Sequence, residues 1–146
     1  MVHKACPCIF RSKNGKSEML VFKHPHAGHQ MIKGSVELHE SIEHAVLREL
    51  EEESGIANGK VIRHLSSIDF IRKREFQGHE RSELNKWHLY EVHVDELLPD
   101  SWEHKAYGSK AENGLIFGLF WQQLNVEYIG YNKRYTTCFE QISKIC

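Results

Sequence analysis

Residues 34–56, GSVELHESIEHAVLRELEEESGI, constrain the fold and function of this 146-residue chain more than any other segment. Ser41 can act as an N-cap, because its hydroxyl can accept a hydrogen bond from a free amide of the first helical turn. Gly55 supplies the left-handed position at which a helix ends. The apolar residues between them that recur at helical spacing are Ile42, Ala45, Val46 and Leu50. The segment is therefore predicted to form a helix that docks on a sheet.

The same helix carries an unfavourable concentration of acid. Glu49, Glu52 and Glu53 stand at i, i+3 and i+4, so their side chains converge at the edge of the apolar stripe. Like charges so placed cost about 0.2–0.5 kcal/mol per pair, and acids near a helix C-terminus oppose the macrodipole. Arg48 is the adjacent counter-charge. A hard divalent cation, Mg²⁺ or Mn²⁺, would compensate the cluster; the alternative is a solvated acidic helix face that binds no metal.

The spacing of the whole segment matches the Nudix box, G-x5-E-x7-R-E-U-x-E-E-x-G-U, in which U is aliphatic. Its defined positions are filled by Gly34, Glu40, Arg48, Glu49, Leu50, Glu52, Glu53, Gly55 and Ile56. The chain therefore resembles the Nudix hydrolases over 23 residues. The resemblance implies an α/β/α sandwich with a mixed central β-sheet, in which the box forms a loop, a helix and a second loop.

The resemblance also implies a reaction, which is metal-dependent hydrolysis of a nucleoside diphosphate linked to another moiety by attack of water on phosphorus. It makes Glu52 and Glu53 the main ligands of the metal. Glu49 would be a ligand or the base that activates the water, and Arg48 would orient the glutamates. A cation in such a site neutralises the diphosphate and the charge of the transition state.

The loop before the helix has implied roles of its own. Gly34 would allow a tight turn that brings the backbone carbonyl of Lys33 near the metal, and Glu40 would brace the loop. His39 departs from the family pattern, because many members have glycine just before the second conserved glutamate. This departure affects the loop geometry that we expect but removes no ligand.

Many family members add a glutamate from a loop beyond the box. The candidates in the two long loops that we expect are Glu80, Glu83, Glu103 and Glu112. We favour Glu112 as a further metal ligand because it directly precedes an apolar strand.

The rest of the chain is predicted to form short strands and one more helix. Strands are expected at 5–11, 19–23, 31–34, 60–73, 86–94 and 115–121, loops at 24–30, 76–85 and 95–114, and a helix near the C-terminus, where Tyr135, Cys138, Phe139, Ile142 and Ile145 recur at helical spacing. The apolar run 115–121 is typical of a strand buried on both faces. Without repeats or linkers, residues 1–146 are expected to form one α+β or α/β/α domain.

Composition excludes several classes of function. The balance of 19 basic and 20 acidic residues argues against non-specific nucleic-acid binding, including binding to DNA. No apolar run approaches the roughly 18 residues of a membrane span, and the N-terminal residues lack a secretion signal. Four scattered cysteines are too few for a disulfide framework, so we expect a cytoplasmic protein with reduced thiols. Cys6 and Cys8 would lie on one side of a strand, as buried thiols or, less favoured, as a metal or redox pair.

Several other residues have both functional and structural interpretations. The histidines of 24–30, His24, His26 and His29, could coordinate a metal or contact a phosphate, although a place on an exposed loop at the rim of the site is favoured. Trp87 and Tyr90 could stack on a base, although a place in the sheet core or at its rim is favoured, and Trp121 is expected in the core. The basic group Arg72, Lys73 and Arg74 could steer an anionic substrate or could be a solvated strand end.

The sequence does not define the substrate. Residues 70–72 lack the marks that identify ADP-ribose or dinucleoside-polyphosphate enzymes downstream of the box. Nucleoside triphosphates, dinucleoside polyphosphates, nucleotide sugars and RNA 5′ ends all stay open as partners, as does the oligomeric state. A Nudix-fold module that binds nucleotides or regulates without catalysis is the alternative, but such modules commonly replace box glutamates and this chain has them all.

Overall fold

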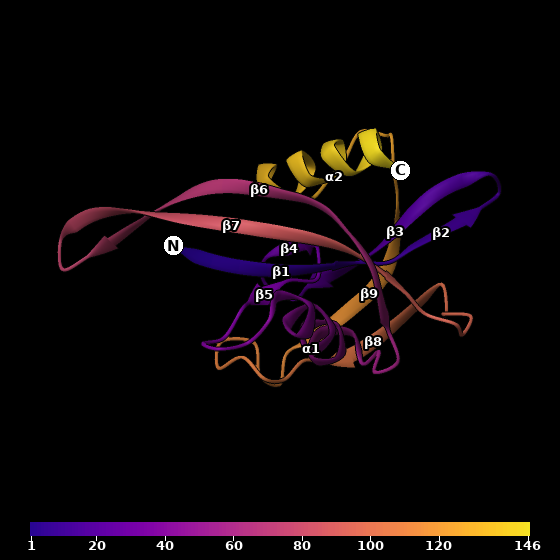
Figure 1. Ribbon diagram of the computed structural model, residues 1–146, viewed down its shortest axis with the longest axis horizontal. Coiled ribbons are helices and arrows are strands. Elements are labelled where there is room, and N and C mark those ends of the chain that lie inside the picture. The colour runs from indigo at the N-terminus through magenta and orange to yellow at the C-terminus, as the bar shows by residue number, and fades with distance from the viewer.

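A computed structural model describes residues 1–146, which form two β-sheets between two helices (Figure 1). The first sheet has the strand order β5 (Gly34–Ser35), β1 (Val2–Cys8), β7 (His79–His93), β6 (Lys60–Phe76). The second has the order β2 (Phe10–Lys13), β3 (Lys16–His24), β9 (Ile116–Gln123), β8 (Ser101–Lys105), with β4 (Gly28–Gln30) paired to β3. The helices are α1 (Ile42–Ser54) and α2 (Lys133–Ile145).

The first sheet is mixed and the second is antiparallel. Strand β1 runs parallel to β7, in a register that pairs Val2 with Asn85 and Cys8 with Glu91, and antiparallel to β5. All other strand pairs are antiparallel. No helix is long and apolar enough to cross a membrane.

Side chains of β1 alternate between two hydrophobic cores, because successive residues of a strand point to opposite faces. Ala5 packs into the core that contains the apolar residues of α1. Cys6 and Cys8 pack on the other side, in the core that contains those of α2. Figure 1 shows the two helices on opposite sides of the strands. The expected α/β/α sandwich with a mixed sheet is therefore confirmed, as is the burial of both thiols.

Helix α1 begins and ends where the sequence predicts. The hydroxyl of Ser41 accepts a hydrogen bond from the amide of His44 at 3.1 Å. Gly55 has φ 83°, a left-handed conformation, and its amide donates to the carbonyl of Glu51 at 2.8 Å. In α2, the side chain of Asn132 caps the first turn, and four of the five predicted apolar positions are buried. The fifth, Ile145, is 41% exposed at the end of the helix.

Three segments expected to be loops contain strands. Residues 76–85 continue β6 and β7, which join through a tight turn at Gln77 and Gly78, both with positive φ. This hairpin projects beyond the rest of the molecule in Figure 1. Its side chains beyond the sheet are exposed and mostly charged, so they lack the apolar alternation on which strand prediction depends. Strand β8 lies within 95–114, and β4 lies within 24–30.

The strand β9 is not buried on both faces, contrary to expectation. Phe117 and Leu119 are buried in the α1 core, whereas Ile116 is 45% exposed. Trp121 is only partly buried, with the guanidinium of Arg11 4.4 Å from its ring. The sheet to which β9 belongs is antiparallel, and such sheets can leave one face in contact with solvent.

Candidate active site

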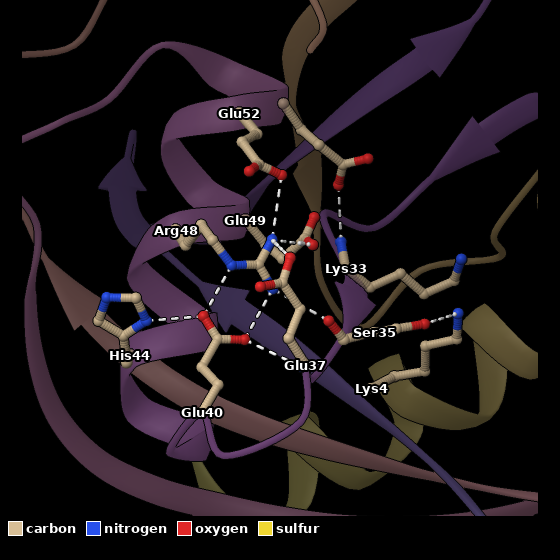
Figure 2. Close-up of polar contacts among 10 residues, drawn as sticks. Lys4, Lys33, Ser35, Glu37, Glu40, His44, Arg48, Glu49 and Glu52 are labelled. Carbon is tan, nitrogen blue, oxygen red and sulfur yellow. Dashed lines mark hydrogen bonds and ion pairs between the residues drawn. The ribbon is translucent and has the colours of Figure 1, made fainter. Parts of the chain in front are cut away.

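Arg48 is the centre of a polar network that joins α1 to the loop before it (Figure 2). Its Nε and Nη2 donate to the two oxygens of Glu40 at 2.7 and 2.9 Å. Its Nη1 donates to Glu49 Oε1 at 2.8 Å and to Glu52 Oε2 at 3.1 Å. Nη2 also donates to the carbonyl of Ser35 at 3.0 Å. One guanidinium therefore holds three box glutamates and the preceding loop in fixed positions.

Glu40 fastens the loop to the helix. Besides the two bonds from Arg48, Glu40 accepts the backbone N–H of Glu37 at 3.0 Å and lies 2.6 Å from Nδ1 of His44. The hydrogen bonds from Arg48 are the main cause that lowers the pKa of Glu40, to about 2. His39, next to it, has φ 65°, so it adopts the left-handed conformation for which glycine is favoured. The loop keeps this conformation at the cost of some backbone strain.

Glu53 is the most buried acid of the segment, with 4% of the residue exposed. Its Oε1 accepts the backbone N–H of Lys33 at 2.9 Å. Burial raises the pKa of Glu53 well above its usual value, and the nearby charges of Glu112 and Glu49 raise it further. The site thus has more negative charge than the protein neutralises.

Glu49 is also buried and also lacks full compensation. Burial raises its pKa to about 6, although the hydrogen bond from Arg48 acts in the opposite direction. Glu52 and Glu112 contribute further negative charge beside it. A carboxylate with a pKa near neutrality can exchange a proton at physiological pH.

Two glycines provide the space for these carboxylates. A Cβ added to Gly34 would lie 1.9 Å from the carboxyl carbon of Glu49, and one added to Gly108 would lie 2.2 Å from that of Glu52. Gly108 also has φ 87°, which disfavours any other residue. Sequence reasoning identified Gly34 but missed Gly108, whose only signal was its place in a glycine- and serine-containing loop.

Strand β8 holds the C-terminal end of α1. Nε1 of Trp102 donates to the carbonyl of Ser54 at 2.9 Å, and Nε2 of His104 lies 3.1 Å from the carbonyl of Glu52. These bonds satisfy carbonyls that have no partner within the helix. Neither residue was predicted to support the site, because 95–114 was expected to be a loop.

The four candidate glutamates beyond the box lie in different places. Glu112 lies close enough to raise the pKa of both Glu49 and Glu53, and its carboxylate is 3.9 Å from Nε2 of His24. Glu80 and Glu83 belong to the projecting hairpin, where they face Lys73 and Arg74 at 3.5 and 3.9 Å. Glu103 lies in β8 and is separate from the network around Arg48.

The histidines of 24–30 are less exposed than predicted. The side chain of His24 is 13% exposed, and His29 packs against Phe120 and Tyr131. Only His26 is exposed. His29 and Phe120 help to line a cleft of about 520 Å³ on the second sheet, and none of the box carboxylates lines this cleft.

The carboxylates of Glu49, Glu52 and Glu53 are ligands of the type that a hard divalent cation prefers. Two of these carboxylates are buried with raised pKa values, and the two glycines leave room for Glu49 and Glu52. In the arrangement seen here, no three acidic, histidine or cysteine side chains surround a common point closely enough to hold a metal ion. Arg48 Nη1 instead bridges Glu49 and Glu52. Metal binding would therefore require these two carboxylates to turn away from the guanidinium.

The family model of the NUDIX domain matches residues 1–112, and the chain belongs to this family. Its fold is similar to that of C. elegans Ap4A hydrolase, with a TM-score of 0.59 and 20% identity over 99% of this chain and 97% of that chain. A binary complex of a C. elegans Ap4A hydrolase gives a TM-score of 0.60 at 20% identity, over 99% and 96% of the two chains.

A third similar structure is the NUDIX domain of Shewanella oneidensis NrtR complexed with ADP ribose. Its TM-score is 0.64 at 14% identity, over 99% of this chain and 87% of that chain. At such identities these likenesses establish the fold. No curated protein sequence matches the chain significantly.

Proposed function

We propose that this protein is a Mg²⁺- or Mn²⁺-dependent Nudix hydrolase that cleaves the diphosphate linkage of a nucleoside diphosphate joined to another moiety. The observation that carries the proposal is the incompletely compensated negative charge of Glu49 and Glu53, two buried carboxylates in a complete Nudix box. Retaining these charges destabilises the fold without a cation. Membership of the Nudix family and structural likeness to an Ap4A hydrolase support the same reaction class.

In this proposal Glu49, Glu52 and Glu53 hold the metal, with the Lys33 carbonyl and Glu112 as further ligands. The cation would neutralise phosphate oxygens and acidify a bound water. Arg48 orients the carboxylates and is itself fixed by Glu40. The amide of Lys33 sets the position of Glu53. Glu49, with its pKa of about 6, is suited to accept a proton from the attacking water if it is not a ligand.

The proposed partner is a phosphorylated nucleotide-type molecule. The similar structures include an Ap4A hydrolase and a NUDIX domain complexed with ADP ribose, which supports a nucleotide as the partner and does not select one. An RNA 5′ end belongs in the same panel of substrates. We also propose a reducing, cytoplasmic location, which the four free cysteines support.

The test is release of phosphate or nucleotide products from a panel of nucleotides with Mg²⁺ or Mn²⁺. Glu53→Gln should lower kcat by about 100-fold or more, because it removes one charge of the site while keeping its shape. Glu51→Gln is the matched control, since Glu51 is exposed on the same helix and should be replaceable without loss. Full activity of Glu53→Gln would show that its assigned role is wrong.

Calorimetry with Mn²⁺ separates the remaining alternatives. We expect binding to the unmodified protein and much weaker binding to the Glu52→Gln, Glu53→Gln double variant. Metal binding and tight nucleotide binding without turnover of any substrate would instead favour a regulatory module. Negligible heat with both proteins would favour a solvated acidic helix face.

A further inference from the structure

Two cationic side chains lie over aromatic rings beside the acidic site. Nζ of Lys33 is 5.3 Å from the centre of the Trp87 ring and 5.6 Å from that of Tyr135. Cζ of Arg134, from the first turn of α2, is 6.0 Å from the centre of the same Trp87 ring. Trp87 and Tyr135 are 98% and 93% buried, so the two cations mark the edge of the α2 core.

Two further cations reach the same face of the first sheet. Lys4 lies opposite Trp87 in the register of β1 and β7, so both side chains point to the α2 side. Arg72 points to this side as well, because it stands four residues after Ile68, which is the partner of Trp87 in β6. The pKa of Lys4 is lowered by burial and then by the charges of Lys33 and Arg72, which places the charges near one another.

These four residues, Lys4, Lys33, Arg72 and Arg134, are called the cation cluster below. None of them forms an ion pair. Glu83 is opposite Arg72 in the strand register, but its carboxylate accepts a hydrogen bond from Asn85 and lies 3.9 Å from Arg74. No carboxylate lies within ion-pair distance of these four cations, although Glu53 and Glu49 act on Lys33 and Lys4 at longer range. In a protein with net charge −1, this excess of positive charge on one side of a sheet favours an external anion.

Two more observations favour a ligand that accepts hydrogen bonds. Nε1 of Trp87, the indole beneath Lys33 and Arg134, is buried and has no hydrogen-bond partner. The first turn of α2 starts with Lys133 and Arg134 and contains no acid, although cations there oppose the helix dipole. Ammonium, guanidinium and indole groups can only donate. A phosphate, with several acceptor oxygens and negative charge, complements all of them.

Lys33 connects this cluster to the carboxylates. Its backbone amide donates to Glu53, while its side chain reaches the aromatic rings. Figure 2 shows the side chains of Lys33 and Lys4 extending together away from Glu49 and Glu52. The cation cluster and the proposed reaction centre are therefore separated by about the length of the Lys33 side chain.

We propose that the cation cluster is a subsite for a phosphate group that the substrate carries outside the cleaved diphosphate. The substrate would then contain at least three phosphates. This inference rests on the proposed function for its placement in a reaction, but phosphate binding at the cluster is independent of metal and of turnover.

The binding test uses inorganic tripolyphosphate and calorimetry in EDTA. The unmodified protein should bind it, and an Arg72→Ala, Arg134→Ala double variant should bind about tenfold more weakly or worse, since charged hydrogen bonds are lost. Lys16→Ala, Lys144→Ala is the matched control, because both lysines are exposed cations outside ion pairs and away from Trp87. Circular dichroism would verify that each variant is folded. Equal affinities of the double variant and the control, or no binding by the unmodified protein, would overturn the inference.

A second measurement reports on the ring itself. The indole N–H resonance of Trp87, identified with Trp87→Phe, should shift as tripolyphosphate is added, while those of Trp102 and Trp121 should not. A purely structural role for the cluster would leave all three resonances unchanged. Adenosine 3′,5′-bisphosphate that displaces tripolyphosphate from the cluster would assign the subsite to a separate phosphate of the substrate. Tripolyphosphate binding that adenosine 3′,5′-bisphosphate does not displace would assign it to a continuous phosphate chain.

Kinetics distinguish this inference from the proposed function. The Arg72→Ala, Arg134→Ala variant should have a KM about tenfold higher for a nucleoside triphosphate. Its KM for ADP-ribose, which has two phosphates, should be unchanged. Equal effects on both substrates would refute the subsite while leaving the hydrolase intact. Tripolyphosphate binding that depends on the cluster, in a protein that turns over no nucleotide, would refute the hydrolase and leave the anion site intact.

Discussion

Replacing Glu49 with glutamine should stabilise the metal-free protein, in a way that depends on pH. Burial raises the pKa of Glu49 from 4.5 to about 6 in the folded state. One pKa unit corresponds to about 1.4 kcal/mol, so the ionised carboxylate costs the fold about 2 kcal/mol. The side chain is only 10% exposed, so solvent screens little of this cost. Glutamine resembles the protonated acid and keeps an oxygen that can accept the bond from Arg48.

The direction of the pH effect follows from proton linkage. Between pH 4.5 and 6 the folded state holds the proton of Glu49 more tightly than the unfolded chain does. The free energy of unfolding therefore falls as pH rises through this window. Glu49→Gln has no charge at this position, so its free energy of unfolding should not fall in this window. Its excess over that of the unmodified protein should be absent below pH 4.5, grow between pH 4.5 and 6, and level off at about 2 kcal/mol near pH 7.

The assay is urea unfolding in EDTA at a series of pH values, with the fluorescence of the tryptophans as the signal. Glu51→Gln, which removes an exposed charge of the same helix, should show no such pH-dependent difference. Saturating Mn²⁺ should remove or reverse the advantage of Glu49→Gln, because the ion would stabilise only the carboxylate form. A difference that does not change with pH would refute the assignment of Glu49 as a buried charge that Arg48 compensates only in part.

Three further predictions concern the loop and the space around the carboxylates. Glu40→Gln should lower the free energy of unfolding at pH 7 by up to about 3 kcal/mol, because the pKa of Glu40 is depressed from 4.5 to about 2, mainly by Arg48. The stabilisation by ionised Glu40 is present above pH 4.5 and is lost as pH falls towards 2. Equal stability in urea of Glu40→Gln and the unmodified protein at pH 7 would contradict this prediction. His39→Gly should raise the thermal midpoint, because relief of about 1–2 kcal/mol of left-handed strain at φ 65° exceeds the entropic cost of glycine, which is about 0.5–1 kcal/mol. An unchanged or lower midpoint would argue against strain at His39. Gly108→Ala should displace the carboxylate of Glu52 and weaken Mn²⁺ binding in calorimetry, and unaltered binding would show that Glu52 does not need this space.

The box was predictable from sequence because its rules are local. A serine cap, a glycine stop and an apolar stripe define α1, and the structure places both ends at the predicted residues. The spacing of the acids likewise predicts that Glu49, Glu52 and Glu53 gather on one patch. Their differences in burial depend on the strands beneath the helix, and the spacing gives no information on them.

Features made by distant segments were not predictable in the same way. Where the hairpin of β6 and β7 extends beyond the sheet, it carries charged residues on both faces. No alternation of apolar and polar residues therefore marks it as a pair of strands. The space for Glu52 depends on Gly108, more than fifty residues away. The cation cluster unites β1, the loop before β5, β6 and α2. Because it depends on tertiary contacts between four segments, no local pattern signals it.

The parallel pairing of β1 with β7 has a consequence for the order in which the molecule can be built. Residues 2–8 leave the ribosome well before their partner, residues 85–91, is synthesised. Pairings between segments so far apart in sequence form slowly. Until then, neither the core that buries Ala5 nor the core that buries Cys6 and Cys8 is complete. Strand β1 therefore stays an unpaired, apolar segment during synthesis, and such segments are prone to aggregate.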